Sequence, residues 1–161
     1  LKKKEKFISA YNEYSDEIFR YCFYRVFDRE KARELSQETF MKVWRYLQEH
    51  DIDQLRAFLY KTAYHLIVDN SKKNKENSLE KMMETGFDVI DHKNCNKKDY
   101  MDVMAIKEEI AKLDEKSQEI MQLRFFSDLP LVDIAKVIGQ SENHVAVKIH
   151  RILKKLKINL E

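Results

Sequence analysis

The sequence predicts an all-α protein made of two small helical domains joined by a flexible linker. Only two of its 161 residues are glycine and one is proline, whereas strands connected by tight turns need both residue types more often. Apolar residues make up 43% of the chain, which is enough to build a packed core. These residues recur at three- and four-residue steps, and the sustained alternation typical of strands is missing.

Residues 1–73 are expected to form the first domain, which contains three helices. Apolar side chains recur at helical spacing from Phe7 to Cys22, from Ala32 to Leu47 and from Leu55 to Ile67. Asp28 and Arg29 interrupt the pattern after the first helix, and a polar segment at 49–53 separates the second helix from the third. This domain is therefore predicted to be a bundle of three helices with short connections.

Residues 74–100 are expected to be a flexible linker, because they are polar and lack helical periodicity. The two cysteines of the chain are Cys22, in an apolar helical stretch, and Cys95, in this polar segment near His92. Two such cysteines make neither a disulfide framework nor a zinc site. We therefore expect no bound metal and no cofactor.

Residues 101–161 are expected to form the second domain, which contains four helices. The first of them ends near Leu113, and Asp114 is suited to cap the second. The third begins at Leu129-Pro130, because proline is tolerated in the first turn of a helix.

The last two helices of this domain are predicted to form a helix-turn-helix. Gly139 stands where the turn needs a positive φ, and Ser141 is suited to cap the final helix. One face of that helix is apolar, with Val145, Ile149, Ile152 and Leu156. Its candidate DNA-contacting residues are Asn143, His144, Val147, Lys148, His150, Arg151, Lys154 and Lys155. A helix with one packed apolar face and one cationic face is suited to enter a DNA major groove. The alternative is an ordinary amphipathic helix whose polar face is only solvated.

Charge, motifs and hydropathy also limit the classes of protein to which the chain could belong. The net charge is only +2, but residues 141–161 hold five lysines or arginines against two glutamates, and such local clustering matters more for phosphate binding than the total. We find no glycine-rich phosphate loop, catalytic triad or metal-spaced ligand set, so an enzyme is not expected. No apolar run approaches a membrane span and no signal peptide is visible, so we expect a cytoplasmic protein without membrane insertion.

Three segments carry a resemblance to a known family. The first runs from Ala32 to Trp44 and contains Gln37-Glu38-Thr39-Phe40, and the second runs from Leu55 to Ala63 and is followed by Asp69. The third is the helix-turn-helix, with Ile134-Ala135, Gly139, Val145, His150-Arg151 and Leu156. In this order, with a linker before the last, they resemble bacterial RNA polymerase sigma factors of the extracytoplasmic-function (ECF) group of the sigma-70 family.

The resemblance implies a role for each segment. Core polymerase would be bound by Glu34, Leu35, Gln37, Glu38, Phe40 and Trp44, although burial of the two aromatic rings in their own domain is the alternative. The promoter −10 element would be held by Arg56, Lys61, Tyr64, His65, Lys72 and Lys73. The loop from Gln48 to Gln54 would form a pocket for a flipped base, and the helix-turn-helix would read the −35 element.

The function implied is that of a transcription initiation factor that directs core polymerase to promoters and aids strand opening. Its partners would be the β′ clamp and β flap of the core enzyme, promoter DNA and an anti-sigma factor. A stand-alone helix-turn-helix regulator that does not bind polymerase, and a helical adaptor that has lost promoter binding, are the alternatives. Three positions depart from the family pattern: His65 replaces the usual asparagine, and Ala146 and Lys148 replace lysine and arginine. We expect these three differences to alter which promoter bases the protein recognises.

Overall fold

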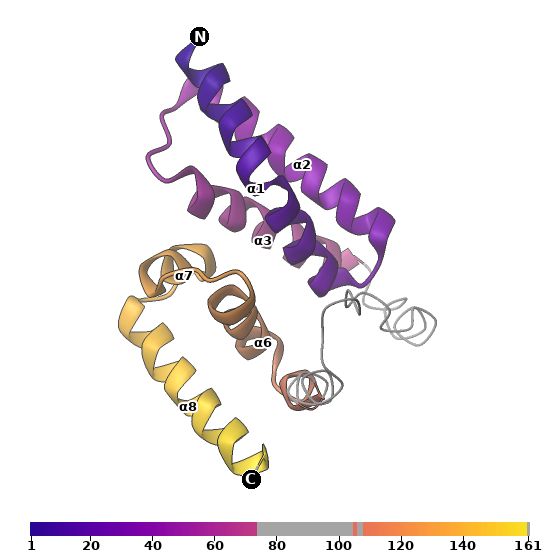
Figure 1. Cartoon of the computed structure of the whole chain (residues 1–161), viewed down its shortest axis with the longest axis vertical. Helices are drawn as coiled ribbons and strands as arrows, with labels where there is room; N and C mark the ends of the chain where they lie inside the picture. Colours follow the sequence, from indigo (N-terminus) through magenta and orange to yellow (C-terminus); the bar gives the residue numbers. More distant parts are fainter. Residues whose placement is uncertain (74–104, 106–107, 161) are drawn as a thin grey trace. The chain divides into compact units, whose positions relative to one another are not determined.

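The structure is a computed structural model that describes residues 1–73, 105 and 108–160. The chain divides into two units, Leu1–Gly86 and Phe87–Glu161. Throughout the described residues the secondary structure is helical and contains no strand, so the all-α prediction is confirmed (Figure 1). No helix within these residues is both long and apolar enough to cross a lipid bilayer. The predicted linker at 74–100 lies outside them.

Three helices make up the described part of the first unit: α1 (Lys2–Val26), α2 (Arg29–Glu49) and α3 (Leu55–Lys73). Each of the three packs against the other two (Figure 1). Their facing apolar stripes bury Ile18, Tyr21, Cys22, Val43, Leu47, Leu59, Tyr60 and Ala63. The core therefore lies along the shared axis of the bundle and leaves the outer edges of α2 and α3 to solvent.

The connection between α1 and α2 is built from two residues. Phe27 adopts the left-handed conformation, with φ 53°, and its N–H donates to the carbonyl of Phe23 at 2.8 Å. Asp28 then caps α2, because its carboxylate accepts the N–H groups of Glu30 and Lys31 at 3.0 and 3.2 Å. The interruption of the apolar pattern at Asp28 thus marks a helix start as well as a turn.

The second unit continues from helical residues 108–111 through α6 (Glu115–Met121), the π-helical segment η2 (Gln122–Phe126), α7 (Leu131–Ile138) and α8 (Glu142–Leu160). Its core collects Ile120, Leu123, Leu129, Ile134, Val137, Val145, Ile152 and Leu156. Pro130 stands just before α7 rather than inside it. Helices α7 and α8 pack against each other and form the predicted helix-turn-helix (Figure 1).

The turn between α7 and α8 follows the predicted chemistry. Gly139 has φ 71°, and the N–H groups of Gly139 and Gln140 both donate to the carbonyl of Ala135. The hydroxyl of Ser141 accepts the N–H of His144 at 3.1 Å, as expected of a helix cap. These bonds fix the angle at which α8 leaves the turn.

Candidate functional site

A hollow of about 480 Å³ lies between α1 and α2. Its lining is mostly apolar and comprises Lys4, Phe7, Ile8, Tyr11, Gln37, Phe40, Met41 and Trp44. The ring of Phe7 packs against Trp44 and that of Tyr11 against Phe40, each with centroids 4.9 Å apart. Ile8, Tyr11 and Met41 keep about half of their surface exposed. We refer to this feature as the α1–α2 hollow.

The α2 residues that sequence reasoning selected fall into two groups. Glu34, Gln37 and Glu38 are exposed, and Gln37 lies on the rim of the α1–α2 hollow. Leu35 and Phe40 are each only 4% exposed, so they support the surface from beneath, whereas Trp44 is half-buried. The apolar residues that α1 adds to this surface were missed. The signal for them was Ile8 and Tyr11, which extend the apolar pattern of α1 beyond its core stripe.

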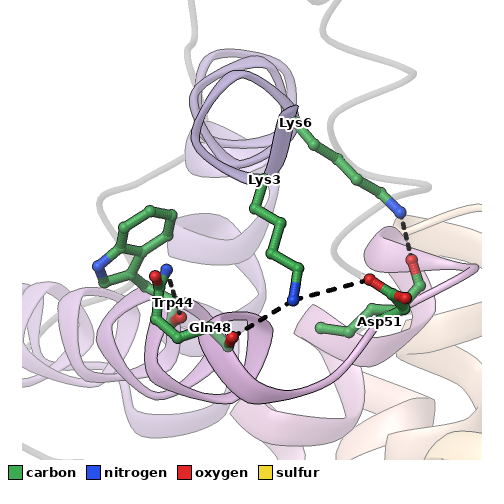
Figure 2. Close-up of polar contacts among 6 residues, drawn as sticks. Lys3, Lys6, Trp44, Gln48 and Asp51 are labelled. Carbon is green, nitrogen blue, oxygen red and sulfur yellow. Dashed lines mark hydrogen bonds and ion pairs between the residues drawn. The ribbon is translucent and has the colours of Figure 1, made fainter. Parts of the chain in front are cut away.

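The first turns of α1 hold the loop between α2 and α3. Lys3 donates to the carbonyl of Gln48 at 3.3 Å and lies 3.8 Å from a carboxylate oxygen of Asp51. Lys6 donates to the carbonyl of Ile52, whose side chain is buried. Figure 2 shows both lysines reaching from α1 across to this loop. The loop from Gln48 to Gln54, in which the resemblance implies a pocket for a flipped base, therefore has its backbone bonded at two carbonyls.

Helix α3 presents a polar stripe to solvent. Lys61, His65 and Lys72 are exposed and share one side of the helix, because they are four and seven residues apart. We refer to these three residues as the α3 stripe. Tyr64 is half-buried beside it, with its ring centroid 5.5 Å from that of His65, and Lys73 is exposed at the helix end. Five of the six residues assigned to the −10 element thus lie on or next to an open face.

The sixth, Arg56, is directed into the bundle. Its Nε lies 2.9 Å from a carboxylate oxygen of Glu17 on α1, and the hydroxyl of Tyr60 donates to the same oxygen at 2.7 Å. The guanidinium also lies over the rings of Tyr14 and Tyr60, at 6.0 and 5.8 Å. Partial burial lowers the pKa of Arg56, but the hydrogen bond and charge of Glu17 outweigh it, so the pKa is raised. This arrangement ties α3 to α1.

Three rings form a stack where α2 ends and α3 begins. The ring of Tyr46 lies over that of His50 with centroids 4.3 Å apart and an angle of 16°, and it contacts Phe58 at 4.8 Å and 31°. Tyr46 is 42% exposed, His50 is exposed and Phe58 is half-buried. We refer to these residues as the ring stack. No sequence signal identified the whole stack, because Tyr46 and Phe58 belong to two helices, α2 and α3, whose relative register is set by packing.

Helix α8 buries its apolar stripe and leaves the opposite face open. Most of its predicted DNA-contacting residues are exposed: Asn143, His144, Val147, His150, Arg151, Lys154 and Lys155. Lys148 differs, because its side chain is only 27% exposed and its ammonium lies 3.9 Å from the carboxylate of Asp114. Lys148 therefore joins α8 to the start of α6.

The carboxylate of Asp114 has a second partner within α6. It accepts the hydroxyl of Ser117, and this hydrogen bond, opposed by partial burial and assisted by the charge of Lys148, lowers the pKa of Asp114. Within the described residues no group of three or more His, Cys, Asp or Glu side chains could hold a metal ion. His92 and Cys95 lie outside these residues.

Two family models match the chain over most of its length. The model described as Sigma-70 region 2 matches residues 10–76, and the model described as Sigma-70, region 4 matches residues 110–157. The chain belongs to the sigma-70 family. The α1–α2 hollow, the α3 stripe and the ring stack fall within or next to region 2 of this sigma factor, and the helix-turn-helix falls within region 4.

Individual relatives extend the assignment to the ECF group. The sigma factor is 25% identical over 167 residues to RNA polymerase sigma factor YlaC of Bacillus subtilis (strain 168), covering 99% of this chain and 95% of YlaC. It is 21% identical over 166 residues to the ECF RNA polymerase sigma factor SigW of the same organism, covering 92% of this chain and 85% of SigW. Its fold is similar, with a TM-score of 0.70 and 17% identity, to that of the sigma factor RpoE in its complex with the anti-sigma factor NepR from Bartonella quintana. That match covers 97% of each chain.

Proposed function

We propose that this ECF sigma factor binds core RNA polymerase, directs it to specific promoters and helps to open the duplex. The observation that carries the proposal is the presence of regions 2 and 4 in one chain, each with an exposed polar surface of the required chemistry. A stand-alone regulator would need region 4 alone, so the pairing of the two regions favours the initiation factor. The protein then acts by binding and not as an enzyme, and it acts in the cytoplasm, where its polymerase is found.

We place the polymerase contact on the outer edge of α2 and the α1–α2 hollow. Glu34, Gln37 and Glu38 offer exposed polar groups, and the hollow beside them offers an apolar recess lined by Met41 and Trp44. A recess with a polar rim is the usual anatomy of a protein–protein interface. This surface suits the β′ clamp, and the second unit would meet the β flap. An anti-sigma factor, of the kind that accompanies RpoE, would compete for such surfaces.

We place the two DNA contacts on α3 and α8. The α3 stripe and Lys73 supply cations and a ring for the separated strand of the −10 element, since single strands are held by positive grooves and aromatic side chains. The exposed face of α8 would enter the major groove at the −35 element, with Asn143, Val147, His150 and Arg151 toward the bases and Lys154 and Lys155 on phosphates. Lys148 is held by Asp114 and would act through the position of α8.

The proposal is tested by co-elution with core polymerase and by run-off transcription from a genomic library. The purified chain should co-elute with the core enzyme, and the holoenzyme should start transcripts at a restricted set of sites. A chain that binds duplex DNA but does not co-elute with core would be a stand-alone regulator. A chain that binds core without starting transcripts would be an adaptor.

A matched pair of variants locates the polymerase contact. Glu38→Lys reverses a charge on the exposed edge of α2 and should weaken core binding by about tenfold. Glu13→Lys makes the same change on the opposite side of α1 from Lys4, since nine residues correspond to half a turn in projection. It should leave core binding unchanged, and equal losses in both variants would contradict this placement.

A further inference from the structure

We propose that Lys3 and Lys6 are positioning residues, which hold the loop between α2 and α3 in the shape that selects one base of the −10 element. This inference rests on the proposed function and adds to it two residues that precede the part of the chain matched by region 2, residues 10–76. Both lysines belong to the first turns of α1, 45 and 46 residues before the carbonyls that they bind. They would act through the loop and would not touch the base themselves.

The place of these lysines within α1 is unfavourable for the helix itself. The N-terminal end of a helix carries a partial positive charge, so cations are disfavoured there. Nevertheless α1 has lysines at positions 2, 3, 4 and 6, and the acidic residue of its first turn is Glu5. Natural sequences break a local preference in this way chiefly at functional sites. For Lys3 and Lys6, contact with the loop is the task that accounts for it.

Lys3 supplies the end of α2 with a cation that the helix itself lacks. The last four carbonyls of a helix have no partner within it, and cations are favoured near them. The last turn of α2 contains no basic residue, and Lys3 donates to the carbonyl of Gln48 at 3.3 Å. The Lys3 ammonium also lies 3.8 Å from Asp51, but the side chain of Asp51 is 90% exposed, so this ion pair is weak. The bond to the backbone therefore fixes where the loop begins.

Lys6 holds the middle of the same loop. At the two ends of the loop, the N–H of His50 and the carbonyl of Gln54 are bonded to the adjoining helices. Between these ends Lys6 donates to the carbonyl of Ile52, whose side chain is buried. Figure 2 shows both lysines reaching from α1 to the loop. The loop backbone is thus held at its ends and at its centre.

A loop that is held in one shape can select among bases. Its exposed polar side chains are those of His50, Asp51, Asp53 and Gln54, which offer donors and acceptors to the edge of a base. A wrong base is rejected when it leaves such groups unpaired or clashes with them, and a loop that is free to move relieves both penalties. The rival role of the lysines is to offset the two aspartates near DNA phosphates, which would favour every base equally.

The experiment uses holoenzyme assembled from core polymerase and the full chain, with forked DNA built on a promoter recovered by run-off transcription. Each of the four bases is placed in turn at every unpaired position of the −10 element, and the affinity for each fork is measured. Wild type should discriminate among the bases at the position that the loop serves. Lys6→Met should reduce the ratio of best to worst affinity at that position about tenfold and leave the other positions unchanged. Lys3→Met should reduce the ratio at the same position.

Two matched variants serve as controls. Lys6→Arg keeps a cationic donor and should retain the discrimination. Lys2→Met removes the same charge from an exposed position in the same turn region and should behave like wild type. Because Lys2, Lys3 and Lys6 lie at the surface of α1, all the variants should fold, and thermal unfolding checks this.

Each outcome separates the positioning role from its rivals. If Lys6→Met binds forks with all four bases equally more weakly, Lys6 acts through its charge and the inference is wrong. If it weakens core binding instead, the first turns of α1 belong to the polymerase interface and the inference is also wrong. A ratio that keeps its wild-type value in Lys6→Met, or a wild type that discriminates at no unpaired position, rejects the inference and leaves the proposed function intact. Failure of the wild-type holoenzyme to bind any fork would reject both.

Discussion

At the scale of single residues, a basic side chain near DNA-binding elements can have a structural task. Arg56 and Lys61 are five residues apart on α3, which turns them roughly 140° away from each other. Lys61 is exposed, whereas Arg56 is bonded to Glu17 and covered by two tyrosine rings. Their spacing alone could have separated the two roles, because only one of them can share a face with His65.

Arg56→Ala should therefore reduce stability and leave the salt dependence of DNA binding unchanged. Removing the guanidinium leaves the partly buried carboxylate of Glu17 without its charged partner, which should lower the free energy of unfolding by about 2 kcal/mol. Lys61→Ala should behave oppositely and flatten the salt dependence by about one unit. Chemical denaturation and salt-dependent binding titrations measure the two effects, and a flattened slope for Arg56→Ala would reject its structural assignment.

Asp114 should give the second unit a pH-dependent contribution to stability. Its pKa lies below the ordinary value of 3.8, chiefly because the Ser117 hydroxyl donates to the carboxylate. A carboxyl with a lowered pKa stabilises the fold above its ordinary pKa, and this contribution is lost as pH falls through the lowered value. Asp114→Asn should thus melt at a lower temperature than wild type at neutral pH, and the gap should close in strong acid. A gap that widened on acidification would contradict the assigned sign.

At the scale of elements, local chemistry predicted the ends of helices better than the contacts between them. The turn at Gly139, the cap at Ser141 and the apolar stripe of α8 all follow from residue type and spacing, and the structure confirms them. The bond of Lys148 to Asp114 and the ring stack join different elements, and their geometry depends on how helices slide and rotate during packing. No periodic pattern within one helix carries that information, so these contacts could not be predicted.

The turn of the helix-turn-helix should be sensitive to backbone conformation rather than to space. A Cβ at Gly139 would meet nothing within 4 Å, but the residue has φ 71°. Gly139→Ala should lower the free energy of unfolding by about 1 kcal/mol, and Gly139→Asn should cost less, because asparagine tolerates the left-handed region. Equal losses in the two variants, measured by chemical denaturation, would point to a steric cause instead.

The loop between α2 and α3 should depend on the first turns of α1. Lys6→Met removes the donor to the carbonyl of Ile52, so amide hydrogen exchange at residues 50–54 should become faster. Lys2→Met removes the same charge from an exposed position in the same turn region and serves as the control. Unchanged exchange in Lys6→Met would show that packing of the buried Ile52 side chain is sufficient to hold the loop.

At the scale of the whole molecule, the two units carry separate cores and separate surfaces. Sequence reasoning predicted this division from composition, because a polar segment without periodicity separates two apolar patterns. The boundaries at 73 and 101 remain a prediction. Because each unit has its own core, a substitution in the binding surface of one unit should leave the binding surface of the other unchanged.

Variants in the two units should therefore combine additively in promoter binding by the holoenzyme. Glu38→Lys should act on assembly with core, and Lys154→Ala on binding to all duplex sequences alike. Since the positions belong to units with separate cores, the free-energy cost of the double variant should equal the sum of the single costs within about 0.5 kcal/mol. Binding titrations of the four proteins test this, and a larger deviation would reveal coupling between the units.

The chain contains a single tryptophan, and its position has a practical consequence. Trp44 lines the α1–α2 hollow, half-buried, with Phe7 against its ring. Any partner that fills the hollow would exclude water from the indole ring of Trp44, and its fluorescence emission would then shift to shorter wavelength. The native chain thus carries its own unlabelled optical reporter, which could follow arrival and departure of a partner that lacks tryptophan in real time.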